Sequence, residues 1–97
     1  MSNLELKEKI FIDNGDILKE ICDYMEVSTQ YFEEEFSDFL SCEGSWVTTD
    51  KNITYTDVMV QGFMIESDRK KFEVIPVSII DEEFSKILEN KIMVVEI

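Results

Sequence analysis

The 97-residue sequence lacks histidine and contains only one proline, three glycines and two cysteines. Without histidine the commonest general base is absent, and nucleophile pairs of the Ser-His or Cys-His kind are excluded. So few glycines cannot form a glycine-rich phosphate-binding loop. No apolar run approaches the roughly 20 residues that cross a bilayer. The sequence therefore predicts neither an enzyme nor a membrane-spanning protein, and it indicates no cofactor.

The cysteines and the first residues indicate a cytoplasmic protein. Cys22 and Cys42 form no Cys-x-x-Cys motif and have no third metal ligand beside them. We expect both to be reduced and buried, with a disulfide or a reactive thiol as the alternatives. Residues 1–5 lack the basic region and apolar core of a signal peptide. The acidic cluster 13–16, followed by Glu20, does not match a calcium-binding loop, so a turn before a helix is expected there rather than a metal site.

Negative charge is what the sequence has in excess: 22 Asp and Glu against 9 Lys and Arg, a net charge of −13. The segment 13–43 alone carries −9, whereas 1–12 is neutral and 44–97 carries −4. The apolar content of 44 %, with seven Phe and three Tyr, excludes an acidic disordered tail. We expect one domain, 1–97, with an acidic helical part and a sheet-rich part. Its field would repel nucleic acid and anionic membranes and attract basic proteins.

Hydrophobic periodicity predicts an α+β fold in the order (β)ααβββαβ, a mainly antiparallel sheet with helices packed on one face. Two single residues indicate local structure: Ser28 is a good N-cap for the second helix, and Pro76 indicates an edge strand or a bulge. The core face of the second helix would be Phe32, Phe36, Phe39 and Leu40.

Polar residues also mark the expected starts of two other helices. Asp13 or Asn14 can cap the first helix. Asp81 would cap a short third helix whose inward residues are Phe84, Ile87 and Leu88. In chain order we expect a strand or frayed helix at 4–12 and helices at 16–25 and 28–41. A strand at 46–49, a turn at 50–52 and a strand at 53–56 follow, and the second of these strands can run on to 65 past a bulge or bend at Gly62. The last elements are a turn at 67–70, a strand at 72–80, a helix at 82–90 and a strand at 91–97.

Acidic residues at helical spacing form the candidate site. On the first helix Asp16, Glu20 and Asp23 are spaced by four and three positions and share one face. On the second helix Glu34 and Asp38 lie at i and i+4, and Glu33 and Glu35 flank Glu34. Like charges at this spacing cost a few tenths of a kcal/mol each, so we interpret them as kept for a partner; the alternative is a surface charged only for solubility. Lys19 would partly neutralise Asp16 and Asp23. The predicted partner-binding residues, each a phosphate surrogate, are Asp16, Glu20, Asp23, Glu33, Glu34, Glu35 and Asp38.

In size, charge, lack of histidine, richness in Lys, Asn and Ile, and acid-studded helices, the chain resembles the small acidic DNA-mimic inhibitors of bacteriophages, such as anti-restriction and anti-CRISPR proteins. The resemblance implies a stoichiometric inhibitor in the host cytoplasm. Its carboxylates would occupy the nucleic-acid channel of a basic protein, a CRISPR or restriction nuclease. Direct binding to nucleic acid or membranes is not expected, because the main basic cluster is only 69–71, at a predicted hairpin tip.

Two other functions fit the same sequence. One is an immunity protein that neutralises a cognate basic nuclease toxin, since this too needs a carboxylate-rich face against a cationic cleft. The other is a structural or assembly module that dimerises through a sheet edge at 91–97, with the acidity serving solubility alone.

Overall fold

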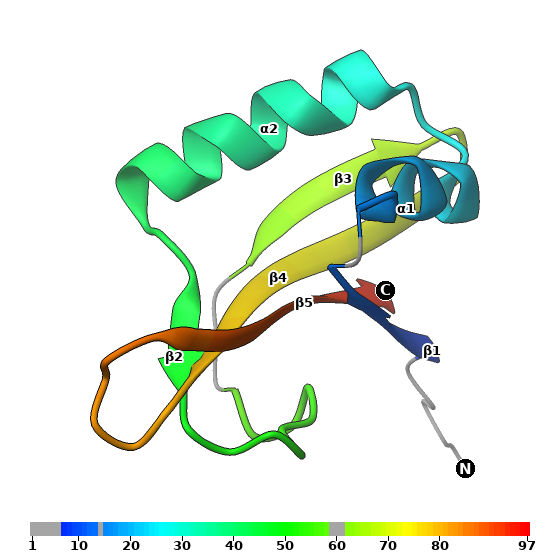
Figure 1. Cartoon of the computed structure of the whole chain (residues 1–97). Helices are drawn as coiled ribbons and strands as arrows, with labels where there is room; N and C mark the ends of the chain where they lie inside the picture. The colour runs from blue at the N-terminus through cyan, green and yellow to red at the C-terminus, as the bar shows by residue number, and fades with distance from the viewer. Residues whose placement is uncertain (1–6, 14, 59–61) are drawn as a thin grey trace, which may run out of the picture.

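The computed structural model describes residues 7–13, 15–58 and 62–97. These residues form two helices and a five-stranded mixed, mostly antiparallel sheet, which confirms the predicted α+β class. Both helices lie on one face of the sheet (Figure 1). In chain order the elements are β1 (Lys7–Ile12), α1 (Ile17–Met25), α2 (Thr29–Cys42), β2 (Trp46–Thr48), β3 (Phe63–Ser67), β4 (Lys70–Ile80) and β5 (Ile87–Glu96).

The sheet is organised around β4 and β5, its two long strands. β5 pairs antiparallel with β1 on one side and with β4 on the other. Two strands share the opposite edge of β4: β3 runs antiparallel along Lys70–Val74, and β2 runs parallel along Val77–Ile79. Among the described strands, Pro76 has a registered partner only in β5. The prediction of an edge strand is therefore wrong for β4 as a whole. Its proline nevertheless lies between the residues that pair with β3 and those that pair with β2. No hydrogen bond is lost there, because a proline has no N–H to donate.

The main core lies between the two helices and the sheet. α1 contributes Ile21, Cys22 and Met25, all buried, and α2 contributes the buried Phe32. On the sheet, Phe63 is the centre of an aromatic cluster, with ring centroids 5.8, 5.9 and 5.2 Å from those of Phe32, Phe36 and Phe39. These offset and tilted ring pairs add to the burial of apolar area. Three of the four residues predicted for the core face of α2 thus pack inward; the fourth, Leu40, is 41 % exposed.

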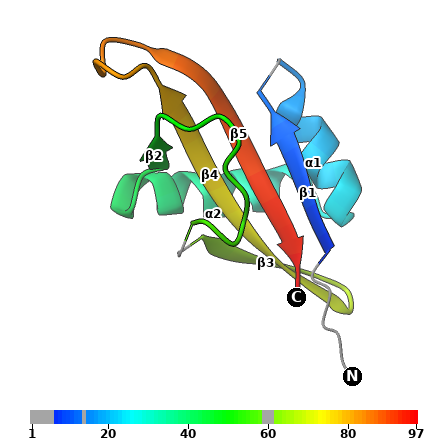
Figure 2. The same cartoon turned by 90° about the horizontal axis from the view of Figure 1, so that it is seen from below.

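The other face of the sheet carries a second, smaller core. Residues 49–58, which follow β2, cross in front of β4 and β5 in Figure 2 and bury Ile53 and Val58 against the sheet. Two hydrogen bonds hold Tyr55 in place: its backbone N–H donates to Glu8 Oε2 (2.8 Å), and its hydroxyl donates to Glu73 Oε1 (2.7 Å). Gly62, predicted to mark a bend, is required by close approach, because a Cβ there would lie 2.1 Å from the Val74 carbonyl oxygen.

The strand predicted at 53–56 does not form, and this part of the prediction was wrong. Residues 54–57 make turns, with the carboxylate of Asp57 accepting from the N–H and hydroxyl of Thr54. β2, the expected hairpin partner, pairs with β4 instead. Residues 59–61, which the predicted strand also covered, and 4–6 of the first predicted strand lie outside the described residues.

The helix predicted at 82–90 was also wrong. β4 runs to Ile80 and β5 begins at Ile87, so the segment is a hairpin loop followed by a strand. Phe84, Ile87 and Leu88, which were expected to point inward from a helix, are exposed. β5 also has a partner strand on each side, so the proposed dimerisation edge at 91–97 is not an edge.

Candidate acidic interface

The first half of the candidate site lies on α1, whose buried face determines where its acids point. Ile21, Cys22 and Met25 are buried against the sheet. At about 100° per residue the opposite side of the helix carries Asp16, Glu20 and Asp23, and all three are exposed. Asp16 occupies the N-cap position without a side-chain capping bond. Of the predicted caps, Asp13 accepts from the N–H of Gly15 (3.4 Å), and Asn14 lies outside the described residues.

The second half lies on α2, which begins as predicted. Ser28 Oγ accepts from the N–H of Tyr31 (3.2 Å), an N-cap contact. With Phe32 buried, the side of α2 that faces away from the sheet carries Glu34 and Asp38, both exposed and one turn apart.

Glu33 and Glu35 lie on opposite flanks of α2, because residues two apart on a helix are separated by about 200°. Glu35 is half-buried and lies one turn after Tyr31, whose hydroxyl accepts from the N–H of Glu66 at β3 (3.3 Å). The Glu35 flank therefore faces β3, and the Glu33 flank faces α1.

A carboxylate from each helix affects the Cys22 thiol. Burial raises the pKa of the Cys22 thiol above its ordinary value, and the negative charges of Asp23 on α1 and Glu33 on α2 raise the pKa further. Cys22 is free and buried as expected; Cys42 is free too, but it is exposed at the end of α2, contrary to the prediction. The structure thus places Asp23 and Glu33 where both act on Cys22, places Glu20, Glu34 and Asp38 outward, and sets Glu35 apart. We call Asp16, Glu20, Asp23, Glu33, Glu34 and Asp38 the acidic face.

Two basic residues lie near α1. Lys19 is exposed, on the same side of α1 as Asp23. Lys9 on β1 places its Nζ 5.6 Å from the ring centroid of Phe11 and 5.8 Å from that of Tyr24. The acidic face is therefore least compensated on α2, where the helix itself carries no base.

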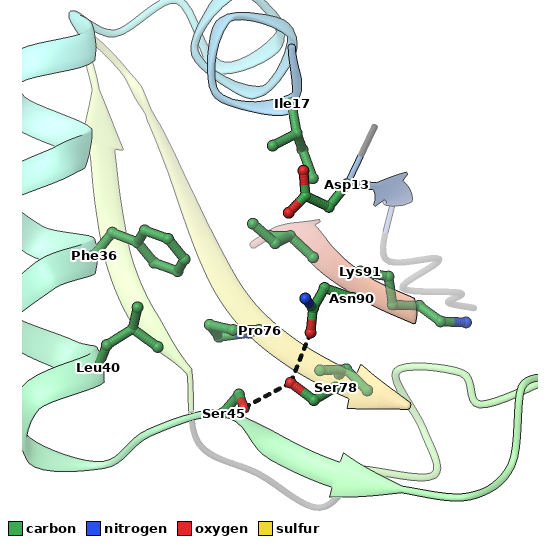
Figure 3. Close-up of a pocket in the computed structure, with 11 residues that line it drawn as sticks. Asp13, Ile17, Phe36, Leu40, Ser45, Pro76, Ser78, Asn90 and Lys91 are labelled. Carbon is green, nitrogen blue, oxygen red and sulfur yellow. Dashed lines mark hydrogen bonds between the residues drawn. The ribbon is translucent and has the colours of Figure 1, made fainter. Parts of the chain in front are cut away.

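A cleft that sequence reasoning missed lies beside α2, with a volume of about 290 Å³ (Figure 3). Phe36 and Leu40 line it from α2 and Ile17 from α1. Along its floor Ser78 Oγ donates to Asn90 Oδ1 (2.8 Å), and the Ser45 and Ser78 hydroxyls are hydrogen-bonded (3.0 Å).

This cleft offers apolar walls, hydroxyls, an amide and, at its rim, the carboxylate of Asp13. Such groups can bind a small ligand or a partner side chain, and they include no nucleophile paired with a base. The residues come from segments 13–17, 36–45 and 76–92, so no local pattern in the sequence could have indicated them.

Comparisons with protein-family models, curated proteins and solved structures find no match for this chain. In the part of the chain that the structure describes, no helix combines the length and the apolar character needed to cross a membrane. Over the same residues, no cluster of Cys, Asp or Glu is arranged to hold a metal ion.

Proposed function

We propose that this protein is a stoichiometric binding protein that presents the acidic face to a basic nucleic-acid-binding protein and takes the place of the nucleic acid. The observation that carries this proposal is the outward, exposed position of Glu20, Glu34 and Asp38 on two helices fixed to the sheet by a buried core. The target we propose is a nuclease of a host defence system of the CRISPR or restriction type.

The spacing of the carboxylates supports mimicry of a phosphate backbone. At about 1.5 Å rise per residue, Asp16, Glu20 and Asp23 follow one another along α1 at about 6 and 4.5 Å. Phosphates along one strand of duplex DNA rise by about 3.4 Å per nucleotide and are further apart along the helical path. A row of carboxylates at this spacing can meet Lys and Arg side chains that otherwise hold successive phosphates.

The rigidity of the helices matters as much as their charge. Phe32 is 1 % exposed and packs on Phe63 of β3 with ring centroids 5.8 Å apart, so α2 is held against the sheet before any partner arrives. A preorganised surface loses less conformational entropy on binding than a flexible acidic tail would. The clustered charge would also steer encounters and make association fast and sensitive to salt.

The test begins with affinity capture from a lysate of the host at low and high salt, followed by identification of the bound protein. We expect a basic nucleic-acid-binding protein that is retained at about 50 mM salt and released at about 500 mM, where screening shortens the Debye length to a few ångströms. The purified complex is then titrated with the nucleic acid that the target normally binds.

Competition between the chain and that nucleic acid supports the proposal. A partner that is not basic, binding that ignores salt, or a stable ternary complex with nucleic acid would show that the proposal is wrong. Recovery of a toxin nuclease encoded beside this chain would assign the same surface to immunity rather than to inhibition of host defence.

A further inference from the structure

The loop 81–86, which joins β4 to β5, projects beyond the body of the sheet, on the side away from α1 (Figures 1 and 2). The loop and the first two residues of β5 carry three large apolar side chains into solvent: Phe84 is 72 % exposed, Ile87 59 % and Leu88 43 %. We call these three residues the apolar tip. Exposed apolar residues scattered singly are ordinary, but three grouped at a protruding hairpin form a patch of the kind that marks an interaction surface.

Hydrogen bonds to Asp81 hold the tip in one conformation. The carboxylate of Asp81 accepts from the N–H of Glu83 (3.1 Å) and of Ser85 (2.7 Å), and also from the Ser85 hydroxyl. The Asp81 carbonyl accepts from the N–H of Phe84 (3.0 Å), and the Asp81 N–H donates to the carbonyl of Lys86 (3.2 Å). The loop is therefore closed on itself, and its apolar side chains are not needed to close it.

The backbone of Phe84 is strained. Its φ is +58°, in the left-handed region that glycine and asparagine adopt readily and that a bulky residue rarely adopts. A phenylalanine in that conformation would be accounted for if its ring packed in a core, but this ring is exposed. Strain that the fold itself does not use points to a role outside the molecule.

The pairing of β4 with β5 also turns apolar residues outward. Ile80 pairs with Ile87 and Ile79 with Glu89, so the register shifts by one residue and Leu88 is the extra residue of a bulge. A bulge changes the direction of the side chains around it. Ile87 and Leu88, three and four residues after Phe84, are thereby both exposed.

We propose that the apolar tip is a second contact site, at which Phe84 enters an apolar pocket of a protein partner whose rim carries Lys or Arg. The charges around the tip favour a partner with a basic surface, because four acids lie near one base: Asp81, Glu82, Glu83 and Glu89 against Lys86. A cationic rim complements them, whereas an anionic membrane and a second copy of a chain with net charge −13 are both repelled. An aromatic anchor at the centre of a contact, ringed by polar groups, is the usual form of an interface hot spot. The proposal does not rest on the acidic face, which lies on other elements.

The experiment uses the full chain with a photo-crosslinking phenylalanine analogue at position 84, and the same analogue at Met64 as a control. Met64 is 43 % exposed on β3 and lies outside the tip. Crosslinking in host lysate at about 500 mM salt screens the acidic face, so that contacts of the tip dominate. We expect one protein adduct at position 84, identified by mass spectrometry, and none of that protein at position 64.

Affinity for the identified protein is then measured with three variants. Phe84→Ala should weaken binding by about 30-fold, as expected for a hot-spot residue, at low and high salt alike. Phe84→Gly relieves the backbone strain, so it should unfold no more easily than the wild type and still bind as weakly as Phe84→Ala. Met64→Ala should bind as the wild type does.

Three results would overturn the proposal: no adduct at position 84, an adduct only with a second copy of the chain, or unchanged affinity in Phe84→Gly. Co-sedimentation with phosphatidylcholine vesicles that depends on Phe84, without a protein adduct, would also overturn it and assign the tip to a lipid surface. Loss of salt-sensitive binding in variants of the acidic face alone leaves this test unaffected, so the two proposals fail separately.

Discussion

Polar side chains that accept hydrogen bonds from nearby backbone N–H groups decide much of the local structure. The same kind of hydrogen bond starts a helix at one place and closes a hairpin loop at another. Ser28 was predicted as an N-cap, and its hydroxyl does accept from the N–H of Tyr31, because this contact lies within one turn of the chain. Asp81 was predicted to cap a helix in the same way. Its carboxylate accepts from the N–H of Ser85 instead and closes a hairpin loop. The sequence shows the acceptor in both cases but not the structure that follows it.

The loop 81–86 should respond to pH through Asp81. Hydrogen bonds from Ser85, and then from the N–H of Glu83, lower the pKa of the Asp81 carboxyl below its ordinary value of 3.8. A carboxyl whose pKa is lowered by folding stabilises the folded loop above its ordinary pKa and loses that contribution as pH falls through the lowered value. We expect the amide resonance of Ser85 in an NMR pH titration to shift with a midpoint below 3.8.

The matched control is Asp81→Asn, which keeps an acceptor oxygen and cannot titrate. In this variant the Ser85 amide should show no such midpoint. A wild-type midpoint at or above 3.8 would contradict the hydrogen bonding described for the loop.

At the scale of secondary-structure elements, the helices α1 and α2 were predictable and two short segments were not. Each helix has an apolar stripe with a period near 3.6, and this stripe faces the core in the structure. A short segment with a few apolar residues, such as 84–88, fits a helix or a strand equally well, and only the hairpin pairing of Ile80 with Ile87 decides. The strand predicted at 53–56 failed for a related reason, since β2 finds a partner in β4 that is far away in the sequence.

The attachment of α2 to the sheet can be tested with a pair of substitutions on that helix. Phe32 is 1 % exposed and packs on Phe63 and Phe36, whereas Leu40 is 41 % exposed. Phe32→Ala should lower the free energy of unfolding by about 3–5 kcal/mol, because it removes a buried ring and leaves a cavity. Leu40→Ala should change it by about 1 kcal/mol or less. Urea unfolding followed by circular dichroism measures both, and equal losses would contradict the packing described for α2.

For the molecule as a whole, the sequence predicted the fold class and the exposure of the acidic residues better than it predicted how those residues are grouped. Counting charges located the acids on two helices, but only the packing of α2 shows that Glu33 faces α1 and Glu35 faces β3. The cleft beside α2 was missed because it depends on contacts between distant segments, and the apolar tip was missed because its residues were predicted to belong to a helix. Periodicity reports which side of an element is apolar, and not which element will cover it.

The central claim is that the acidic face binds by its position and not by the bulk charge of −13. Two triple variants with the same net charge separate these explanations. One replaces Glu20→Gln, Glu34→Gln and Asp38→Asn on the acidic face. The other replaces three exposed acids elsewhere, Asp50→Asn, Glu66→Gln and Asp68→Asn.

The decisive measurement is the dissociation constant of each variant for the captured partner, at salt concentrations from about 50 to 500 mM. At roughly 0.5 kcal/mol per exposed charge pair, loss of three pairs weakens binding by about tenfold at low salt and reduces the dependence on salt. We predict this result for the acidic-face variant, with the control variant close to the wild type. Equal affinities for the two variants would contradict the account, because charge alone and not its placement would then govern binding.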